Sequence, residues 1–338
     1  MENINGGNRK KAPGNRTINV SNEEKKTLRQ TLTVINCPQK LDNIINRTIL
    51  GNTFQIIQYM PVAFADLIFI DPPYNITRDF NGVKFNKISN ENYFKFVQAW
   101  LPQIIKLLKP NGSIYFCSDL HSTAVVQQAL QEHLHIINRI TWQRDKGRGA
   151  KQNWKNNMED IWFAVVNKKN YYFNVNAVKQ KRQVFAPYTE NNKPKDWQMS
   201  DGGKFRITHP SNFWDDISIP YWSMSENTPH PTQKPEKLLA KIILASCPEN
   251  GIVLDPFLGS GTTSVTAKKL GRLYVGIEMN EEYCCISEKR LLNANANKTI
   301  QGYADNVFWE RNTYNMQKKS GQNHKQPSRK NPIPTTLT

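Results

Sequence analysis

The sequence predicts an α/β protein in which a doubly wound, mostly parallel sheet carries a basic insertion between its two halves. Short apolar runs alternate with segments whose apolar residues recur at helical spacing, which is the pattern of successive βαβ units. Two of the apolar runs end in motifs that combine a carboxylate with proline or glycine. Between these motifs the alternation is lost, and basic and aromatic residues accumulate.

The first half of the sheet is predicted before residue 144. Residues 67–70 are four consecutive apolar residues, typical of a strand covered on both faces. A helical pattern follows within 91–112, and Pro102 inside it predicts a kink or a new helix start. A strand is expected at 113–119, a helix at 121–133, and two further strands at 135–143 and 159–166.

The second half of the sheet begins where regular structure returns. Pro235 suits the first turn of a helix, and apolar residues lie on one face of the segment that follows it. The remaining elements are a strand at 251–257, a helix at 260–271, a strand at 272–278 and a helix at 281–296.

Composition divides the chain further. Both ends are polar and basic, which favours mobile segments over a packed core. The predicted segments are a flexible basic stretch (1–35), the first half of the domain (36–143), an insertion that also carries the strand at 159–166 (144–229), the second half of the domain (230–300) and a disordered basic tail (312–338).

The charge balance indicates a polyanionic partner. The 338 residues include 45 Lys and Arg against 28 Asp and Glu, a formal net charge of +17. Nucleic acid is the commonest partner of so basic a protein, and a solvated basic surface is the alternative. Residues 141–210 alone hold 14 basic against 6 acidic side chains, with aromatic residues between them. This pattern favours a nucleic-acid-contacting insertion over a structural excursion.

Cysteine usage and hydropathy bear on the cellular compartment. Five cysteines, an odd number without CxxC spacing, favour reduced thiols over a disulfide framework or a zinc site. The chain does not open with a signal peptide, and no run approaches the ~18 apolar residues of a membrane span. We therefore expect a cytoplasmic protein without a membrane partner and without a metal.

The first motif is Asp71-Pro72-Pro73-Tyr74, at the end of the strand predicted over 67–70. Two consecutive prolines fix the backbone and restrict the residue before them, so the motif is rigid. By itself it fits a strand cap and a tight turn, with the tyrosine filling a gap.

The second motif, Val-Leu-Asp-Pro-Phe-Leu-Gly-Ser-Gly-Thr-Thr over 253–263, is a strand that enters a glycine turn and then a helix. Gly259 and Gly261 permit a tight turn and close approach of a ligand. Glu278 ends the next strand, 23 residues after Asp255 (278 − 255), where an acidic residue can hold ribose hydroxyls. The third glycine of a dinucleotide site and the Gly-Lys-Ser/Thr of a P-loop are both missing, so a nucleoside site is predicted.

Together these motifs resemble the S-adenosylmethionine-dependent DNA amino-methyltransferases. The tetrapeptide 71–74, the turn 255–261 and the segment His-Pro-Thr-Gln-Lys-Pro-Glu-Lys-Leu-Leu over 230–239 carry the resemblance. Their order is similar to the β group, a circularly permuted arrangement typical of restriction–modification methylases. The resemblance covers about residues 45–295 and implies a Rossmann-like class I methyltransferase fold. It also makes the insertion at 144–229 a target-recognition region.

The resemblance implies roles for individual residues. The target base would be extruded from the duplex. The Asp71 carboxylate and the Pro72 carbonyl would accept hydrogen bonds from its amine, Pro73 would keep that carbonyl aimed, and Tyr74 would stack on the base. Asp255 would contact the cofactor through water or only cap the turn. The implied S-adenosyl-L-methionine contacts are Asp255, Phe257, Gly259, Ser260, Gly261, Thr262, Glu278, Thr232 and Lys234. The candidate DNA contacts are Arg144, Lys146, Arg148 and Lys151.

The acceptor expected from the first motif is the N6 amine of adenine, because cytosine-N4 enzymes of this kind more often have serine in place of Asp71. We therefore predict a sequence-specific methyltransferase of double-stranded DNA, paired in function with a cognate restriction endonuclease. Cytosine-N4 methylation at the same site and a non-catalytic DNA-binding protein on the same fold are the alternatives. One departure from the family is Gly51-Asn52, which stands where a Gly-Asp pair is common near the adenine of the cofactor.

Overall fold

The computed structural model describes residues 12–75, 77–80, 83–148, 154–200 and 203–322. In these residues an eight-stranded main sheet has the order β1-β15-β14-β2-β5-β7-β6-β13. Neighbouring strands are parallel except β7, which is antiparallel to β5 and β6. The strand bounds are β1 Arg47–Leu50, β15 Leu273–Glu278, β14 Ile252–Asp255, β2 Ala65–Ile70, β5 Leu108–Ser118, β7 Asn156–Val165, β6 His135–Arg148 and β13 Phe213–Trp214. The predicted doubly wound, mostly parallel sheet is confirmed.

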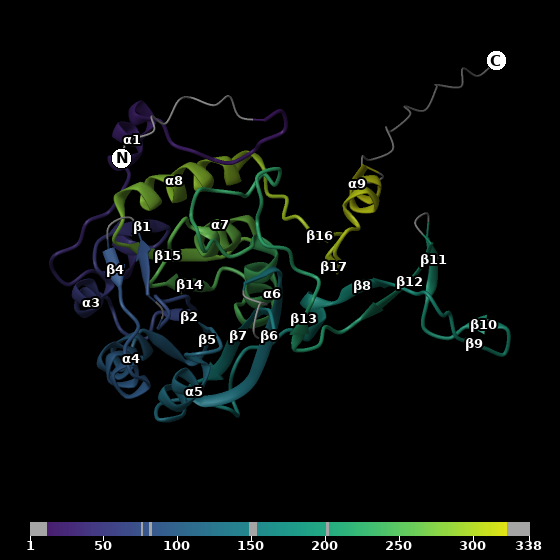
Figure 1. The fold of residues 1–338 in the computed structure, drawn as a ribbon, viewed down its shortest axis with the longest axis horizontal. Helices are drawn as coiled ribbons and strands as arrows, with labels where there is room; N and C mark the ends of the chain where they lie inside the picture. Colours follow the sequence, from purple (N-terminus) through teal and green to yellow (C-terminus); the bar gives the residue numbers. More distant parts are fainter. Residues whose placement is uncertain (1–11, 76, 81–82, 149–153, 201–202, 323–338) are drawn as a thin grey trace, which may run out of the picture.

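Helices cover both faces of this sheet (Figure 1). Helices α4 (Asn90–Ile105) and α5 (Thr123–Gln131) pack with one apolar cluster. Helices α6 (Glu236–Ser246), α7 (Thr262–Lys269) and α8 (Glu281–Ala296) pack with the cluster on the other face. The smaller elements near the first strands are α2 (Leu41–Ile44), α3 (Thr53–Ile56) and η1 (Ile57–Tyr59).

Helix α4 continues through Pro102, so the predicted new helix start there is wrong. A proline inside a helix costs about 3 kcal/mol. Val97, Trp100, Leu101 and Ile104 are all buried on the sheet-facing side of α4. Each such side chain contributes about 1.5–3 kcal/mol on burial, so packing outweighs the lost backbone hydrogen bond.

The two sequence motifs meet where the winding of the sheet changes direction. The chain leaves β2 for α4 on one face and leaves β14 for α7 on the other. The two strands pair in parallel, with Val253 opposite Leu67 and Leu254 opposite Ile68. Ligands of such sheets bind in the crevice outside the carboxyl ends of the strands at this point. Asp71 and Asp255, 184 residues apart in the chain (255 − 71), therefore reach the same crevice.

A second sheet forms an arm that projects from the domain (Figure 1). In the described residues its order is β11-β12-β8-β17-β16, and a β9–β10 hairpin follows β8 along the chain. Strand β17 (Val307–Trp309) pairs in parallel with β8 (Gln180–Gln183), so a segment beyond the predicted second half completes the arm. The other bounds are β9 Thr189–Glu190, β10 Lys193–Pro194, β11 Gln198–Ser200, β12 Gly203–Thr208 and β16 Tyr303–Ala304. Two short elements outside the arm are the hairpin of β3 (Arg78–Phe80) with β4 (Val83–Phe85) and η2 (Val175–Val178).

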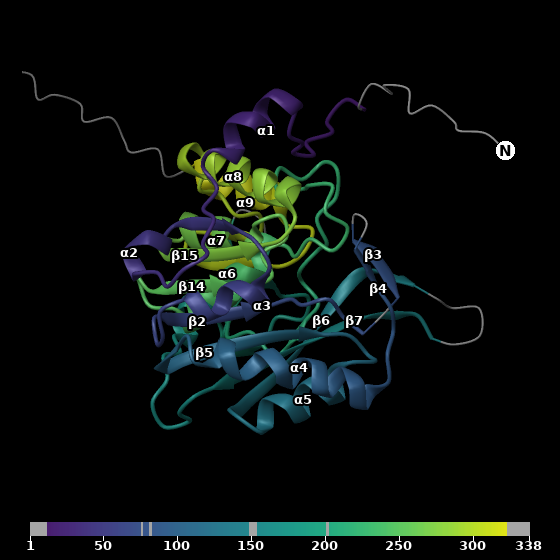
Figure 2. The ribbon, with the colours of Figure 1, turned by 90° about the vertical axis from the view of Figure 1, so that its left-hand side faces the viewer.

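The sequence had predicted a flexible stretch at 1–35, but part of this stretch forms a helix. Helix α1 (Asn22–Arg29) begins with a capping box between Ser21 and Glu24. It lies on α8 (Figure 2), where Lys25 pairs with Glu282 at 3.2 Å. Polar capping and ion pairs hold α1, and these leave no apolar periodicity in the sequence. Residues 1–11 lie outside the described part of the chain.

The C-terminal tail differs from its prediction in the same way. Residues Tyr314–Gln322 form helix α9, within the segment 312–338 that was expected to be disordered. The Gln317 side chain accepts a hydrogen bond from the backbone N–H of Gly302 at 3.0 Å, which ties α9 to the start of the arm. Residues 323–338 lie outside the described range.

The five cysteines are free thiols, and all but Cys37 are buried. Within the described residues, no group of His, Cys, Asp and Glu side chains is arranged to hold a metal ion. No helix in the described part of the chain has the length and apolar character needed to span a bilayer.

Candidate active site

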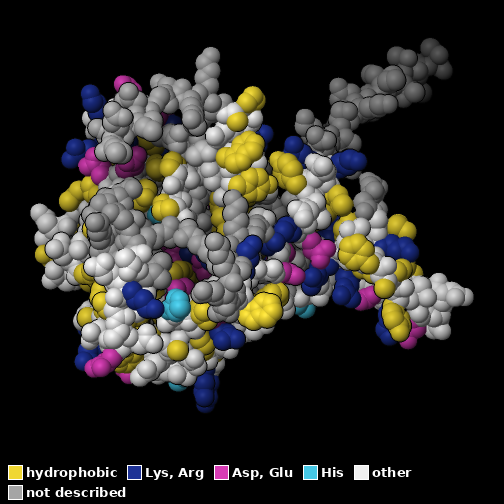
Figure 3. Space-filling view, in the orientation of Figure 1, with side chains coloured by type: hydrophobic (Ala, Val, Ile, Leu, Met, Phe, Trp, Pro, Cys, Tyr) yellow, Lys and Arg dark blue, Asp and Glu magenta, His cyan; other side chains and the backbone are white. Residues whose placement is uncertain are grey.

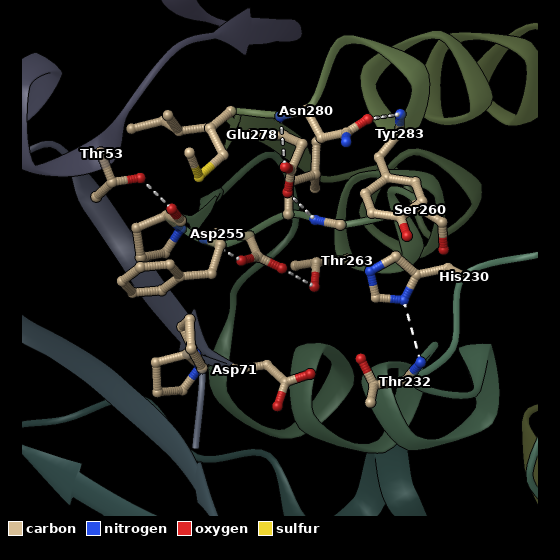
Figure 4. Close-up of a pocket in the computed structure, with 18 of the residues that line it drawn as sticks. Thr53, Asp71, His230, Thr232, Asp255, Ser260, Thr263, Glu278, Asn280 and Tyr283 are labelled. Atoms are coloured by element: carbon tan, nitrogen blue, oxygen red, sulfur yellow. Dashed lines mark hydrogen bonds between the residues drawn. The ribbon is translucent and has the colours of Figure 1, made fainter. Parts of the chain in front are cut away.

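A pocket of about 220 Å³ lies in the crevice at the ends of β2 and β14 (Figure 4). It brings together nearly all of the residues proposed from the sequence for acceptor and cofactor. Those that line it are Asp71, Pro72, Pro73, Tyr74, Thr232, Lys234, Asp255, Phe257, Gly259, Ser260, Thr262 and Glu278. Gly261 is absent from this lining and instead shapes the turn from behind.

The glycine turn requires both of its glycines. Gly259 has φ +55° and Gly261 has φ +86°, a left-handed conformation that side chains disfavour. A Cβ at Gly259 would lie 3.0 Å from Nε2 of His230. A Cβ at Gly261 would lie 2.1 Å from Oγ of Ser287 in α8. The turn is therefore pressed against α8, and its backbone faces the pocket without side chains at these two positions.

Two carboxylates, the half-buried Glu278 and the buried Asp255, fix the shape of this turn (Figure 4). Glu278 accepts hydrogen bonds from the N–H of Gly259 at 2.8 Å and of Asn280 at 2.7 Å. Asp255 accepts from the Phe257 N–H at 2.9 Å and from Thr263 Oγ1 at 2.5 Å. Burial raises the pKa of Glu278, and burial raises the pKa of Asp255 to about 7. Both oxygens of Asp255 are thus engaged inside the turn, which fits the capping alternative for this residue.

Sequence reasoning had singled out Gly51-Asn52 among the further pocket residues and missed most of the others. Asn52, at the end of β1, caps α3 by accepting a hydrogen bond from the Phe54 N–H at 3.0 Å. His230 packs edge-on against Tyr283, with ring centroids 4.4 Å apart. Most of these residues directly follow the carboxyl end of a strand at the same sheet edge, and this position in the sequence is the feature that could have identified them. The additional lining residues include Gly51, Asn52, Thr53, Phe54, His230, Met279, Asn280 and Tyr283.

The side of the pocket predicted to take the acceptor centres on Asp71. Its Oδ1 accepts a hydrogen bond from the Tyr74 hydroxyl at 2.8 Å, and its Oδ2 lies 2.7 Å from Nζ of Lys234. Lys234 was expected at the amino-acid end of the cofactor; it lines the pocket, and its ammonium contacts the Asp71 carboxylate. Burial, Asp71 and Glu159 all raise the pKa of Tyr74, so its hydroxyl stays protonated.

Three of the four candidate DNA contacts lie on strand β6. Arg144 pairs with Glu159, with Nη1 and Oε1 2.8 Å apart. Lys146 and Arg148 lie on the same strand, β6, and Lys151 falls outside the described residues. Contact of these four residues with DNA stays a prediction. Asn75, next to the tetrapeptide, is structural, because its amide exchanges two hydrogen bonds of 2.8 Å with the backbone of Ile88.

The fold and the pocket define a methyltransferase of the Rossmann-like class. Residues 65–289 match the model of the N6/N4 DNA methylase family, and the chain belongs to this family. This match confirms the prediction that the protein is a DNA methyltransferase with S-adenosylmethionine as its methyl donor.

Individual relatives cover most of the chain. It is 33% identical over 260 residues to the DNA adenine methyltransferase YhdJ of Escherichia coli, covering 75% of this chain and 85% of that protein. It is 31% identical over 247 residues to the type II methyltransferase M.HpaI of Haemophilus parainfluenzae, covering 72% and 74%. The solved PvuII DNA methyltransferase, described as cytosine-N4-specific, has a TM-score of 0.53 at 16% identity, covering 75% of this chain and 88% of that one. This last similarity supports the fold.

Proposed function

We propose that the protein transfers a methyl group from S-adenosylmethionine to the N6 amine of adenine in a short target site of double-stranded DNA. The observation that carries this proposal is the placement of Asp71-Pro72-Pro73-Tyr74 beside the glycine turn, at the ends of two paired strands. The identity to a relative named as a DNA adenine methyltransferase supports adenine as the acceptor.

The acceptor side solves a problem of nucleophilicity. The lone pair of an exocyclic amine is delocalised into the base, so the amine attacks poorly until its hydrogens are held. We assign that task to the Asp71 carboxylate and the Pro72 carbonyl, which would localise the lone pair and aim it. Pro73 keeps the turn rigid, and its carbonyl lies 3.4 Å from the Tyr93 hydroxyl. The Tyr74 ring would stack on the extruded base, which is worth about 1–3 kcal/mol.

The residues on the other side of the pocket fit the cofactor. S-adenosylmethionine supplies an electrophilic methyl group on a sulfonium. The glycine turn, with no Cβ at Gly259, lets the backbone approach the methionine part closely. Glu278 uses one lone pair on each oxygen within the turn, so it keeps acceptor capacity for ribose hydroxyls. Thr232 lines the same pocket and is our candidate for the amino-acid end.

We assign target recognition to the insertion at 144–229 and above all to the arm. Lys and Arg side chains mix with hydrophobic ones over its surface (Figure 3). Lys181 lies over the buried rings of Phe205 and Trp309, and Lys204 lies over the half-buried Trp197. Phe185 and Tyr188 of the same insertion are 86% and 75% exposed. Cations neutralise phosphates and exposed rings can stack on bases, so this surface suits DNA.

In the cell, we propose that the protein works in the cytoplasm as the modification arm of a restriction–modification system, with a cognate endonuclease that reads the same site. The relative M.HpaI carries the name of a type II methyltransferase, which supports this assignment. The two proteins would share a DNA sequence without needing to touch each other.

The proposal is tested by expression in a host that lacks DNA methylation, followed by sequencing that detects modified bases. We expect N6-methyladenine in one short motif. N4-methylcytosine in its place would transfer the proposal to the alternative acceptor, and unmodified DNA would favour a non-catalytic DNA-binding protein. Asp71→Ala should abolish the modification while cofactor affinity, measured by calorimetry, stays within about twofold.

A further inference from the structure

Glu159 is a buried carboxylate beside the acceptor site that the mechanism above does not use. It lies on β7 with 7% of its surface exposed. Its Oε1 accepts a hydrogen bond from Arg144 at 2.8 Å, and its Oε2 lies 3.4 Å from both Nζ of Lys234 and the hydroxyl of Tyr74. A buried carboxylate is costly unless its charge is paired, so this arrangement calls for a reason.

Lys234 connects Glu159 to the catalytic carboxylate. The lysine is 6% exposed, and its Nζ stands between Oδ2 of Asp71 at 2.7 Å and Oε2 of Glu159 at 3.4 Å. Burial by itself lowers the pKa of Lys234, but Asp71 and Glu159 outweigh this effect and hold it above its usual range. The side chain is therefore an ammonium shared unequally by two carboxylates.

This sharing bears on how Asp71 receives a base. Both Asp71 oxygens already have a partner, the Tyr74 hydroxyl on Oδ1 and the Lys234 ammonium on Oδ2. Each oxygen keeps a second lone pair, but the ammonium at 2.7 Å offsets the negative charge of Oδ2, so an incoming amine meets a weaker acceptor while the Lys234 ion pair stays closed. A buried ammonium does not leave one anion unless another is at hand. Glu159 is that second anion, and a shift of well under 1 Å brings its 3.4 Å separation to the hydrogen-bond range.

We propose that Glu159 is a positioning residue for methyl transfer, which takes up the Lys234 ammonium when the amine of the target base binds Asp71. Arg144 holds the other oxygen of Glu159 and so fixes the carboxylate in place. The inference rests on the proposed role of Asp71 as the acceptor of the amine. It also gives Lys234 a function on the acceptor side of the pocket.

The first test separates this role from a structural one by a double-mutant cycle. Glu159→Gln keeps the shape and removes the charge, so single-turnover methylation at saturating cofactor should slow by about tenfold or more, with cofactor affinity unchanged. In a Lys234→Gln background the same change should cost less than about twofold, because the ammonium is gone. Additive losses in the two backgrounds, or a normal rate for Glu159→Gln, would overturn the inference.

A second measurement does not need catalysis. Binding is compared for duplexes with adenine or purine at the target position, each opposite an abasic site, in the presence of S-adenosylhomocysteine. Only adenine has the amine that Asp71 accepts, so the wild type should bind the adenine duplex about tenfold more tightly. We expect Glu159→Gln to lose most of this preference. A preference equal to that of the wild type would contradict the role of Glu159.

Controls keep the two levels of the proposal apart. Lys109→Gln removes an ion pair of 2.8 Å to Asp66 outside the pocket and should leave the rate within about twofold. Asp71→Ala is measured in the same series. If it remains active, the proposed role of Asp71 fails, whereas an inactive Asp71→Ala beside a normal Glu159→Gln refutes only the inference about Glu159.

Discussion

Replacing Gly261 by alanine should destabilise the protein more than any other single methyl addition in the glycine turn. The new Cβ would lie 2.1 Å from Oγ, 2.6 Å from Cβ and 2.9 Å from Cα of Ser287. The last of these is backbone, so a rotamer change of Ser287 cannot relieve the clash. The left-handed φ costs about 1–2 kcal/mol, and overpacking adds about 1–3 kcal/mol. We expect a total loss of about 2–5 kcal/mol.

Gly271 provides a matched control for the backbone contribution. It has φ +72°, and a Cβ there would meet nothing within 4 Å. Gly271→Ala should therefore lose only the conformational share, about 1–2 kcal/mol. The difference between the two variants isolates the steric contact with Ser287.

Urea unfolding followed by circular dichroism measures this difference. With a slope of about 3 kcal/mol per molar urea, the midpoint of Gly261→Ala should lie about 0.3–1 M below that of Gly271→Ala. The affinity for S-adenosylmethionine should fall for Gly261→Ala and stay unchanged for Gly271→Ala. Equal midpoints for both variants would refute the inference that the turn is pressed against α8.

Three further predictions concern polar groups. Burial raises the pKa of Asp255 to about 7, so between about pH 4 and 7 the folded state keeps a proton that the unfolded chain releases. The free energy of unfolding should therefore fall by up to about 1.4 kcal/mol per pH unit as the pH rises through this range. Asp255→Asn should flatten that slope in urea titrations; an unchanged slope would refute this assignment. Glu278→Gln turns an NH2 toward the N–H of Gly259 or Asn280, costing about 1–3 kcal/mol, and calorimetry should show weaker cofactor binding; equal affinity would count against it. Ser21→Ala should cost α1 about 1 kcal/mol and speed its hydrogen exchange without changing methylation; unchanged exchange would contradict the capping box.

Local patterns were enough for six of the eight main-sheet strands in the described residues, with β1 and β13 unpredicted, and for the two motifs at the sheet edge. Apolar runs such as 67–70 identify buried strands because a strand covered on both faces has no polar side. Glycines at 259 and 261 identify a tight turn because other residues avoid its backbone conformation. Nearly all of the predicted acceptor and cofactor residues line the pocket, which follows from these strong local signals together with the family resemblance.

Only the tertiary structure decided the contacts between segments with weak local signals. The arm depends on pairing of β17 with β8, and strands of three and four residues are too short to show a period. Helix α1 is held by ion pairs to α8, which leave no apolar pattern in the sequence. The 2.7 Å contact between Lys234 and Asp71 joins residues 163 positions apart. Spacing along the chain carries no record of such a contact, because it arises from the packing of the elements that present the two side chains.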